Sequence, residues 1–509
     1  MSLRSVGSIS LLLCATAALA SGSGTAPKSP SRQPGKQFNV KDYGAQGNGR
    51  GNDTAGIQAA LDAARDAGGG RIYLPAGTYL VGPVSDVVFS VASNSEIAGD
   101  GPSTIIKIRS GAGKYNAIFY SENAANLSYH DFRVDQNPTG NAATPIGDGN
   151  LACPIQNNNY QNLKVQRVRF EPATGAWGVA GLGRKGNQLL VEDCLFDFVN
   201  GRVGKSEDEK DYDNSLIYSQ GIHQRILNNV FKSKAAEHAR TAIEIQGNDV
   251  LIQKNQVDYF ACGTIVTNSL PQDADPTGPV IIENNQFLHI QGGVDLWAST
   301  NRTLRNVKLV SNVFTIAPRA NTWAAHGIAH HIYGGPTSAE DPDTYEGDIA
   351  DVIVSDNTIT FLDAPPKYSD NGGQVTAAIN FDSVGNASNI QIVKNKINDP
   401  PLVGIHLGNP NTKGKLTNVK VEDNVIVNPG WSSTAEAKYR AAVKLEGYLS
   451  GIQLSNNTIK RTAARGGGKG IYTISAHPIS AENVVLKKNV VDAKDGMVPD
   501  LDPSLALQK

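Results

Sequence analysis

A five-residue phrase centred on asparagine recurs nine times between residues 227 and 491, and this repeat limits the fold more than any other feature. Successive copies lie 26 to 45 residues apart, so the intervening loops vary while the phrase persists. Cys194, in CLF, occupies the same slot one unit earlier. The copies are LNNVF at Asn229, QKNQV at Asn255, ENNQF at Asn285, VSNVF at Asn312, SDNTI at Asn357, VKNKI at Asn395, EDNVI at Asn424, SNNTI at Asn457 and KKNVV at Asn489.

A second phrase of four positions precedes most of these copies. It consists of a small residue, an Ile or Val, a variable residue and an apolar residue, in that order. Such alternation is typical of a half-buried strand. We expect its second residues to stack in one inward column: Ile243, Ile265, Val294, Ile328, Ile379, Ile405, Val443 and Ile471. Repeated strands with one inward face and an asparagine column at a turn predict an all-β, single-stranded right-handed parallel β-helix over residues 37–495. Asparagine suits such turns because it tolerates the left-handed backbone and its amides can hydrogen-bond between coils.

The N-terminal stretch differs from the repeats and predicts strand, turn, helix, strand. Asp53 or Thr54 can begin a helix that runs to about Asp66, where GGG ends it. We expect this helix to cap the solenoid, because an open end would expose unpaired strand edges and core. Residues 496–509 are expected to form a C-terminal tail.

The residues of this stretch, DYGAQGNG, NDTAGIQAALDAA and GGGRIYLPAGTYLVG, resemble the N-terminal signature of the pectate-lyase-like superfamily. More narrowly, they are similar to the rhamnogalacturonase/epimerase-type domain. The resemblance covers about 45 residues, Phe38 to Gly82, and implies the parallel β-helix fold. It implies no single activity, because the superfamily includes polygalacturonase-like hydrolases, polysaccharide lyases, mannuronan epimerases and phage tailspikes.

Residues 1–20 have the pattern of a secretory signal peptide, and residues 21–36 are a Ser/Pro/Gly linker. We therefore expect a secreted or periplasmic protein of bacterial type without a transmembrane segment, and a lipoprotein at Cys14 is disfavoured. The three remaining cysteines are interpreted as buried free thiols, with no metal-site spacing. A net charge of −2 gives no reason to expect nucleic acid as a partner. The oligomeric state is not indicated.

Each strand phrase should present three outward positions, since residues two apart point to the same side. We expect a lane of small residues as a groove floor: Ala242, Thr264, Gly293, Gly327, Ala378, Gly404, Ala442 and Gly470. The middle lane should hold Glu244, Val266, Asp295, Ala329, Asn380, His406, Lys444 and Tyr472, with Tyr218 one unit earlier. The outer lane should hold Gln246, Asn268, Trp297, His331, Asp382, Gly408, Glu446 and Ile474.

Clustering of titratable groups in consecutive central rungs favours a site over scattered surface charge. The candidate catalytic residues are Glu244, Asp295, Asp382 and His331. The candidate substrate-binding residues are Tyr218, Arg240, Gln246, Trp297, His406 and Lys444. With one rung between Glu244 and Asp295, their backbones should lie about 9–10 Å apart. Their carboxyl groups could then reach the separation of about 6.5–9.5 Å found in inverting glycosidases, so a polysaccharide-cleaving hydrolase is the first hypothesis.

Two alternatives stay open. Lyase or C5-epimerase chemistry on a uronate polymer needs a base, a group that neutralises the carboxylate and an acid, which Tyr218, His238, Arg240, His331 and Lys444 could supply. A non-catalytic glycan-binding solenoid is the other. The hydrolase motifs NTDG, DD and RIK and the epimerase motif DPH are absent, so no catalytic residue is transferred by motif. No cofactor is expected, although a lyase could use calcium, and the acid-rich residues 207–213 are more typical of a solvated loop.

Overall fold

The computed structural model describes residues 36–144, 146, 150–183, 185–200, 214–237, 239–268, 278–299, 301–318, 324–330, 347–364, 376–382, 385–410, 412–432, 440–462, 472–492 and 498–501. The expected signal peptide and most of the linker lie outside these residues, as do His238, His331 and the acid-rich segment 207–213. No helix in the described ranges combines the length and apolar character needed to cross a lipid bilayer.

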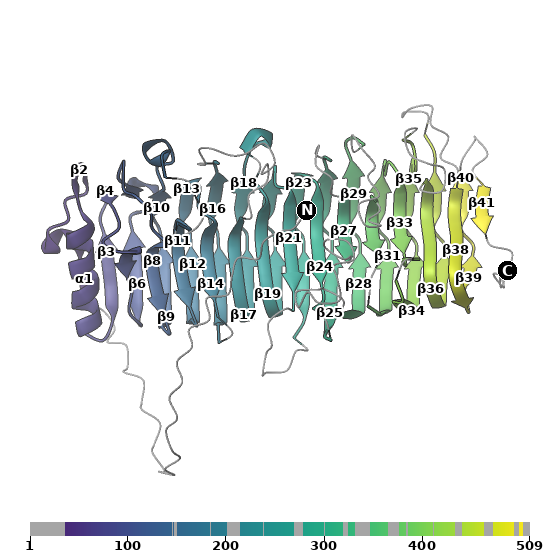
Figure 1. Cartoon of the computed structure of the whole chain (residues 1–509), viewed down its shortest axis with the longest axis horizontal. Helices are drawn as coiled ribbons and strands as arrows, with labels where there is room; N and C mark the ends of the chain where they lie inside the picture. The colour runs from purple at the N-terminus through teal and green to yellow at the C-terminus, as the bar shows by residue number, and fades with distance from the viewer. Residues whose placement is uncertain are drawn as a thin grey trace, which may run out of the picture.

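The strands form three parallel columns that coil along one axis, which confirms a parallel β-helix (Figure 1). The first column consists of β5 (Val87–Ser90), β8 (Ala117–Glu122), β11 (Cys153–Asn158), β14 (Trp177–Leu182), β17 (Ser215–Leu227), β19 (Thr241–Gln253), β21 (Cys262–Thr267), β24 (Gly292–Trp297), β27 (His326–His330), β30 (Ala377–Phe381), β33 (Val403–Leu407), β36 (Ala441–Ser455), β38 (Tyr472–Glu482) and β41 (Val498–Leu501). The second consists of β1 (Gln37–Asn39), β3 (Gly70–Leu74), β6 (Ser95–Gly99), β9 (Ala125–His130), β12 (Gln161–Gln166), β15 (Asn187–Glu192), the second halves of β17, β19 and β36, and β22 (Val280–Glu283), β25 (Thr303–Val310), β28 (Asp348–Ser355), β31 (Ala387–Val393), β34 (Lys415–Glu422) and β39 (Val485–Lys487).

The third column forms a separate sheet that closes the coil. It consists of β2 (Asn48–Asn52), β4 (Gly77–Val81), β7 (Thr104–Ile108), β10 (Arg133–Asp135), β13 (Arg169–Ala173), β16 (Leu195–Phe198), β18 (Val230–Lys232), β20 (Gln256–Asp258), β23 (Gln286–Ile290), β26 (Val313–Ile316), β29 (Thr358–Phe361), β32 (Lys396–Asn398), β35 (Val425–Val427), β37 (Thr458–Lys460) and β40 (Val490–Asp492). The last strand of the coil, β41, lies beyond residue 495, where we expected the tail.

The predicted asparagine column is a continuous hydrogen-bonded ladder from Asn229 to Asn489. Each side-chain amide donates to the carbonyl oxygen of the next asparagine at 2.9–3.1 Å. The ladder ends at Cys194, whose backbone N–H donates to Asn229 Oδ1. The backbone expectation was wrong by one residue: the left-handed conformation belongs to the preceding residue, such as Asn228 or Lys254. The ladder asparagines are therefore selected for their amides.

The inward column is confirmed for most strands but shifted in β21. Ile243 pairs with Thr264, which pairs with Val294, and Ile328, Ile379, Ile405 and Val443 continue the column. Ile265 was expected in this column and instead pairs with Glu244, on the outward face. The column then reaches Ile474 in place of Ile471, which lies outside the described residues.

The lane of small residues faces the core, which corrects the expected groove floor. A Cβ on Gly293 would lie 2.5 Å from a ring carbon of Phe314, and one on Gly327 would lie 2.8 Å from Ile359 Cδ1. Ala242 is fully buried in the hydrophobic core. These positions are small because aromatic and aliphatic side chains of the third column occupy the space opposite them.

The helix α1 (Thr54–Asp66) forms at the expected residues and lies at the N-terminal end of the coil in Figure 1. Its apolar face, which includes Ile57, Leu61 and Ala64, is buried. The helix contacts β1, β3, β5 and β6. Asp53 begins it without a side-chain cap and accepts instead from the backbone N–H groups of Gln46 and Gly47.

Candidate active site

One outward column brings together half of the candidate residues predicted from sequence: Tyr218, Glu244, Asp295, His406 and Lys444. Register places Tyr218, Glu244, Ile265, Asp295, Ala329, Asn380, His406 and Lys444 in line on successive strands. Glu244 and Asp295 therefore lie two rungs apart, as expected, but with Ile265 between them and not Val266. Rung spacing puts their backbones about 9–10 Å apart.

A neighbouring column holds Gln220, Gln246, Thr267 and Trp297 in direct register. Thr267 takes the position expected for Asn268, because β21 is shifted by one residue. Asp382 directly follows β30, two strands beyond Trp297, and Glu446 lies in β36. The candidate His331 lies outside the described residues.

The outward face of the first strand column carries one more line of side chains, which the sequence pattern did not predict. It contains Ser215, Thr241, Cys262, Gly292 and His326 in register, each immediately before the inward-facing pair of its strand. Two consecutive inward residues, such as Ala242 and Ile243, break the strict alternation expected of a half-buried strand. The histidine of HGIAHH that precedes the glycine was the available signal.

Glu244 is held in a polar network with its upstream neighbours. The Ser215 hydroxyl donates to Glu244 Oε2 at 2.7 Å, and Gln246 Nε2 donates to Glu244 Oε1 at 3.2 Å. Gln246 also donates to the Tyr218 hydroxyl at 2.8 Å. Glu244, Tyr218 and Gln246 are half-buried, so this part of the column remains open to solvent and to a ligand.

Asp295 lies in a buried cluster with His326 and Cys262. Its Oδ1 forms an ion pair with His326 Nε2, and its Oδ2 accepts from Cys262 Sγ at 3.3 Å. Burial raises the pKa of the Cys262 thiol well above its usual value, and the nearby Asp295 carboxylate raises it further. The thiol therefore stays protonated. Cys262, Ile265 and Trp297 form a small apolar cluster separate from the main core, and Trp297 is 7% exposed. An apolar surface therefore separates Glu244 from the Asp295–His326 pair.

Asp382 carries a deeply buried carboxyl with a raised pKa. It is 2% exposed, and its Oδ1 is buried without a hydrogen-bond partner among the described residues. Burial raises the pKa of Asp382 to about 6, although the charges of His406 and His326 and a hydrogen bond with Asn380 oppose the rise. A carboxyl with such a pKa can both accept and donate a proton near neutral pH.

A chain of polar contacts lies beside Asp382. His406 Nδ1 contacts Asn380 Oδ1 at 2.8 Å, and His406 Nε2 contacts Glu446 Oε2 at 2.9 Å. Lys444 Nζ lies 2.5 Å from Glu446 Oε1. Burial acts to raise the pKa of Glu446, but His406 and Lys444 outweigh it and lower the pKa to about 2. His406 and Lys444 are 1% and 4% exposed, so they hold this network together and do not reach into solvent.

Arg240 lies in the turn before β19, at the edge of the site. Its backbone carbonyl accepts from Cys262 N at 2.6 Å, and the charge of its guanidinium acts to lower the pKa of Cys262. The arginine therefore lies near the upstream side of the Asp295 cluster. It is half-buried.

Within the described ranges, no group of three or more His, Cys, Asp or Glu side chains is arranged to hold a metal ion. The carboxylates of the site are instead engaged by protein groups: Asp295 by His326, and Glu446 by His406 and Lys444. The acid-rich segment 207–213 lies outside the described part of the chain.

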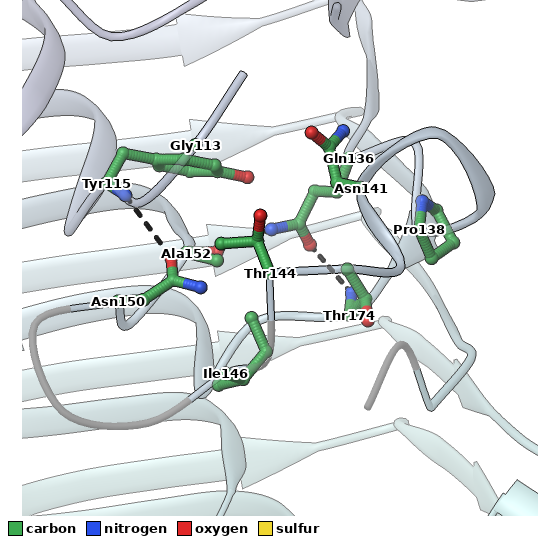
Figure 2. Close-up of a pocket in the computed structure, with 10 residues that line it drawn as sticks. All are labelled: Gly113, Tyr115, Gln136, Pro138, Asn141, Thr144, Ile146, Asn150, Ala152 and Thr174. Atoms are coloured by element: carbon green, nitrogen blue, oxygen red, sulfur yellow. Dashed lines mark hydrogen bonds between the residues drawn. The ribbon is translucent and has the colours of Figure 1, made fainter. Parts of the chain in front are cut away.

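A separate small cavity lies at the turns that precede β8, β11 and β14 (Figure 2). Its volume of about 20 Å³ suits a water-sized occupant. Gln136, 2% exposed, accepts from Thr174 N at 2.7 Å and donates to Ala152 O, while Asn150 Oδ1 accepts from Tyr115 N at 3.2 Å. These bonds tie the segment after β10 to the coil, so the cavity is part of the wall beside the first column and not a substrate site.

Comparison with known proteins finds similarity to polysaccharide-modifying enzymes over part of the chain. The chain is similar to mannuronan C5-epimerase AlgE3 of Azotobacter vinelandii, 38% identical over 147 residues, which are 27% of this chain and 8% of that protein. It is similar to alginate lyase 7 of the same organism, 30% identical over 203 residues, which are 37% of this chain and 23% of that protein. The chain therefore spans less than a quarter of the length of either relative.

Among solved structures, a tailspike protein mutant of E. coli bacteriophage HK620, in complex with a pentasaccharide, superposes with a TM-score of 0.60. The match covers 88% of this chain and 80% of that chain at 16% identity, so it concerns the fold alone. The family model for rhamnogalacturonase A/epimerase, pectate lyase-like proteins matches residues 37–295, more than half of the chain. The protein therefore belongs to the rhamnogalacturonase A/epimerase family of the pectate-lyase-like superfamily.

Proposed function

We propose that this protein modifies a uronate-containing polysaccharide by removing the proton at C5, with Asp382 as the group that moves that proton. The single observation that carries the proposal is the Asp382 carboxyl, which is buried, has one oxygen with no partner in the described part of the chain, and has a pKa of about 6. At neutral pH most of it is ionised, and a base with a pKa near the working pH combines availability with strength.

The surroundings of Asp382 suit the second requirement of this chemistry. Removing the C5 proton places negative charge on the uronate carboxylate, and nearby cations lower the cost of that charge. The charges of His326 and His406 both act on Asp382, and His406 belongs to a network with Lys444. A uronate carboxylate bound beside Asp382 would lie near these positive charges.

Removal of the C5 proton can lead to two products, by elimination or by epimerisation. In both, the C5–H bond breaks and its electron pair enters an enolate of the carboxylate. In elimination, the pair then forms the C4–C5 double bond while the C4–O bond breaks and the leaving oxygen takes a proton. In epimerisation, C5 takes a proton on the opposite face. The relatives' names, C5-epimerase and alginate lyase, support this pair of outcomes. The epimerase motif DPH is absent here, so the proton chemistry would use other residues.

Hydrolysis remains a second candidate because of one specific observation. Glu244 and Asp295 lie in one outward column two rungs apart, a spacing compatible with the carboxyl separation of inverting glycosidases. Against it, Asp295 is already paired with His326, whereas a general acid or base needs a carboxyl available to the substrate. Sequence motifs of the polygalacturonase-like hydrolases are also absent.

A panel of polymannuronate, polyguluronate and polygalacturonate tests the proposal. Ultraviolet absorbance of an unsaturated uronate together with new reducing ends indicates elimination, and a changed C5 configuration without new ends indicates epimerisation. New reducing ends without either signal, lost in Glu244→Gln and Asp295→Asn but kept in Asp382→Asn, would replace the proposal by hydrolysis. Binding without any reaction would favour a glycan-binding solenoid.

A further inference from the structure

The outward face upstream of Glu244 carries an array of amides and aromatic rings that the proposed chemistry does not use. Register places Tyr120, Gln156, Ala180 and Tyr218 in line on β8, β11, β14 and β17, as the continuation of the candidate column. Three steps of about 4.8 Å make this stretch about 14 Å long. We define these residues, with Trp177 and Gln220, as the upstream platform.

Two rings of the platform stack face to face at its downstream end. The centroids of Trp177 and Tyr218 lie 5.2 Å apart with an interplanar angle of 16°. Both side chains are half-buried, so part of each ring surface remains accessible. Such rings offer the apolar face on which a sugar ring packs, with polar edges at the rim.

Amide groups surround these rings and orient one another. Gln220 Nε2 donates to Gln246 Oε1 at 3.1 Å, and Gln220 Oε1 accepts from Gly183 N at 2.8 Å. Farther upstream, Asn158 Nδ2 donates to the Tyr120 hydroxyl at 3.2 Å, which in turn donates to Glu122 at 3.0 Å. Hydroxyl groups of a sugar can both donate to and accept from such side chains.

Gln156 supplies an independent indication that a ligand completes the array. It is 8% exposed, its Nε2 donates weakly to Asn158 Oδ1 at 3.4 Å, and its Oε1 is buried with no hydrogen-bond partner within the described ranges. A buried carbonyl oxygen without a donor costs free energy, so buried polar groups in folded proteins are nearly always paired. A hydroxyl donor on a bound ligand would satisfy it.

From these observations we infer that the upstream platform is a separate glycan-binding subsite that holds a stretch of the polysaccharide through ring stacking and hydroxyl hydrogen bonds. The inference rests on the proposed function for the identity of the polymer. The platform would extend the contact between protein and polymer from β8 to Asp382, which follows β30. This distance is eight strand steps, or about 38 Å, along the coil. Long chains should therefore bind more tightly than short ones.

Calorimetric titration with oligomannuronates from dimer to octamer tests this subsite. In the wild-type protein, affinity should rise steadily with chain length. Gln156→Leu removes the amide at similar volume and should weaken octamer binding roughly tenfold, the scale of one good hydrogen bond. Because no ion pair is involved, the loss should be equal at low and high salt.

Gln166→Leu is the matched control. Gln166 is a half-buried outward glutamine on β12, which belongs to the second column of strands and lies outside the platform. It should bind octamer as the wild type does. Octamer binding that is equal in Gln156→Leu and Gln166→Leu, or affinity that does not grow with length, would overturn the subsite. If Tyr218→Phe and Gln156→Leu both weaken binding but no uronate polymer reacts, the platform stands and the proposed chemistry fails. If a uronate polymer reacts but both variants bind it as tightly as the wild type does, the proposed chemistry stands and the platform fails.

Discussion

The two halves of the outward face follow the same ladder geometry but differ in burial. From β8 to β19 the column carries amides and aromatic rings that are mostly half-buried and bonded to one another. From β24 to β36 it carries carboxylates, histidines and a lysine that are mostly more than nine-tenths buried. Apart from the carboxylates Glu122 and Glu244, the first half offers neutral hydrogen bonds and stacking surfaces, and the second holds charges in a dry environment.

This difference indicates how one repeated strand can serve two purposes. Burial in a low dielectric strengthens the interaction between charges and shifts pKa values, while exposure leaves them near their ordinary range. Asp382 and Glu446 show the two possible results, since burial dominates the pKa of the first and cationic partners dominate the pKa of the second. We therefore expect chemistry downstream and recognition upstream.

The largest expected effect is on turnover in Asp382→Asn. The amide keeps the shape but cannot take a proton, so turnover should fall by two or more orders of magnitude, roughly the contribution of a positioned acid or base. Polymer binding should be nearly unchanged. Glu122→Gln, an exposed upstream carboxylate, is the control and should keep near-native turnover. Equal losses in the two variants would contradict the division between the halves.

Glu446→Gln should have a smaller effect with a distinctive pH signature. The substitution removes a negative charge from the network beside Asp382 and leaves Lys444 without its carboxylate partner, which favours the ionised form of Asp382. The pKa of Asp382 should then fall, and the acid limb of the pH–rate profile should move downward by roughly half a unit to one unit. A reduced rate with an unchanged profile would indicate that Glu446 is only structural.

The buried carboxyl also predicts a pH-dependent stability difference. Because the pKa of Asp382 is raised from 3.8 to about 6, its contribution to stability is fully present below pH 4 and is lost as the pH rises through 6. Asp382→Asn lacks this loss. Denaturant titrations should show its unfolding free energy gaining on the wild type by up to about 3 kcal/mol between pH 4 and pH 7. A constant difference across this range would contradict the burial of the charge.

The smallest expected effect is on turnover in Tyr218→Phe. Loss of the hydroxyl that accepts from Gln246 should weaken polymer binding several-fold, while turnover at saturation changes little. The alternative is informative, because a collapse of turnover would make Tyr218 the acid of the reaction. The chemistry would then extend into the upstream half.

Periodicity alone was sufficient to predict the architecture, because the asparagine ladder and the inward Ile/Val column are sequence-local patterns. It failed in β21, where Thr264 and not Ile265 faces the core, since both residues fit the phrase and only register decides. It also missed His326, because two consecutive inward residues interrupt the alternation. The role of α1 as a cap stays a prediction, which Leu61→Asp would test by loss of thermal stability.

The candidate carboxylates could be predicted as outward positions, but their partners could not. Asp295 pairs with a histidine from the next strand of the first column, 31 residues away, and Glu446 with a histidine 40 residues away. Loop lengths between strands vary, so sequence distance does not reveal which side chains meet. The raised pKa of Asp382 follows from burial, which an outward position does not suggest.

The most direct test of the central claim uses polymannuronate labelled with deuterium at C5. Elimination and epimerisation both break the C5–deuterium bond, whereas hydrolysis leaves it intact. The wild-type protein should release the label into water with a primary isotope effect, and Asp382→Asn should bind the polymer and release almost none. Cleavage of the polymer with the label retained, or equal release by Asp382→Asn, would contradict proton chemistry at Asp382.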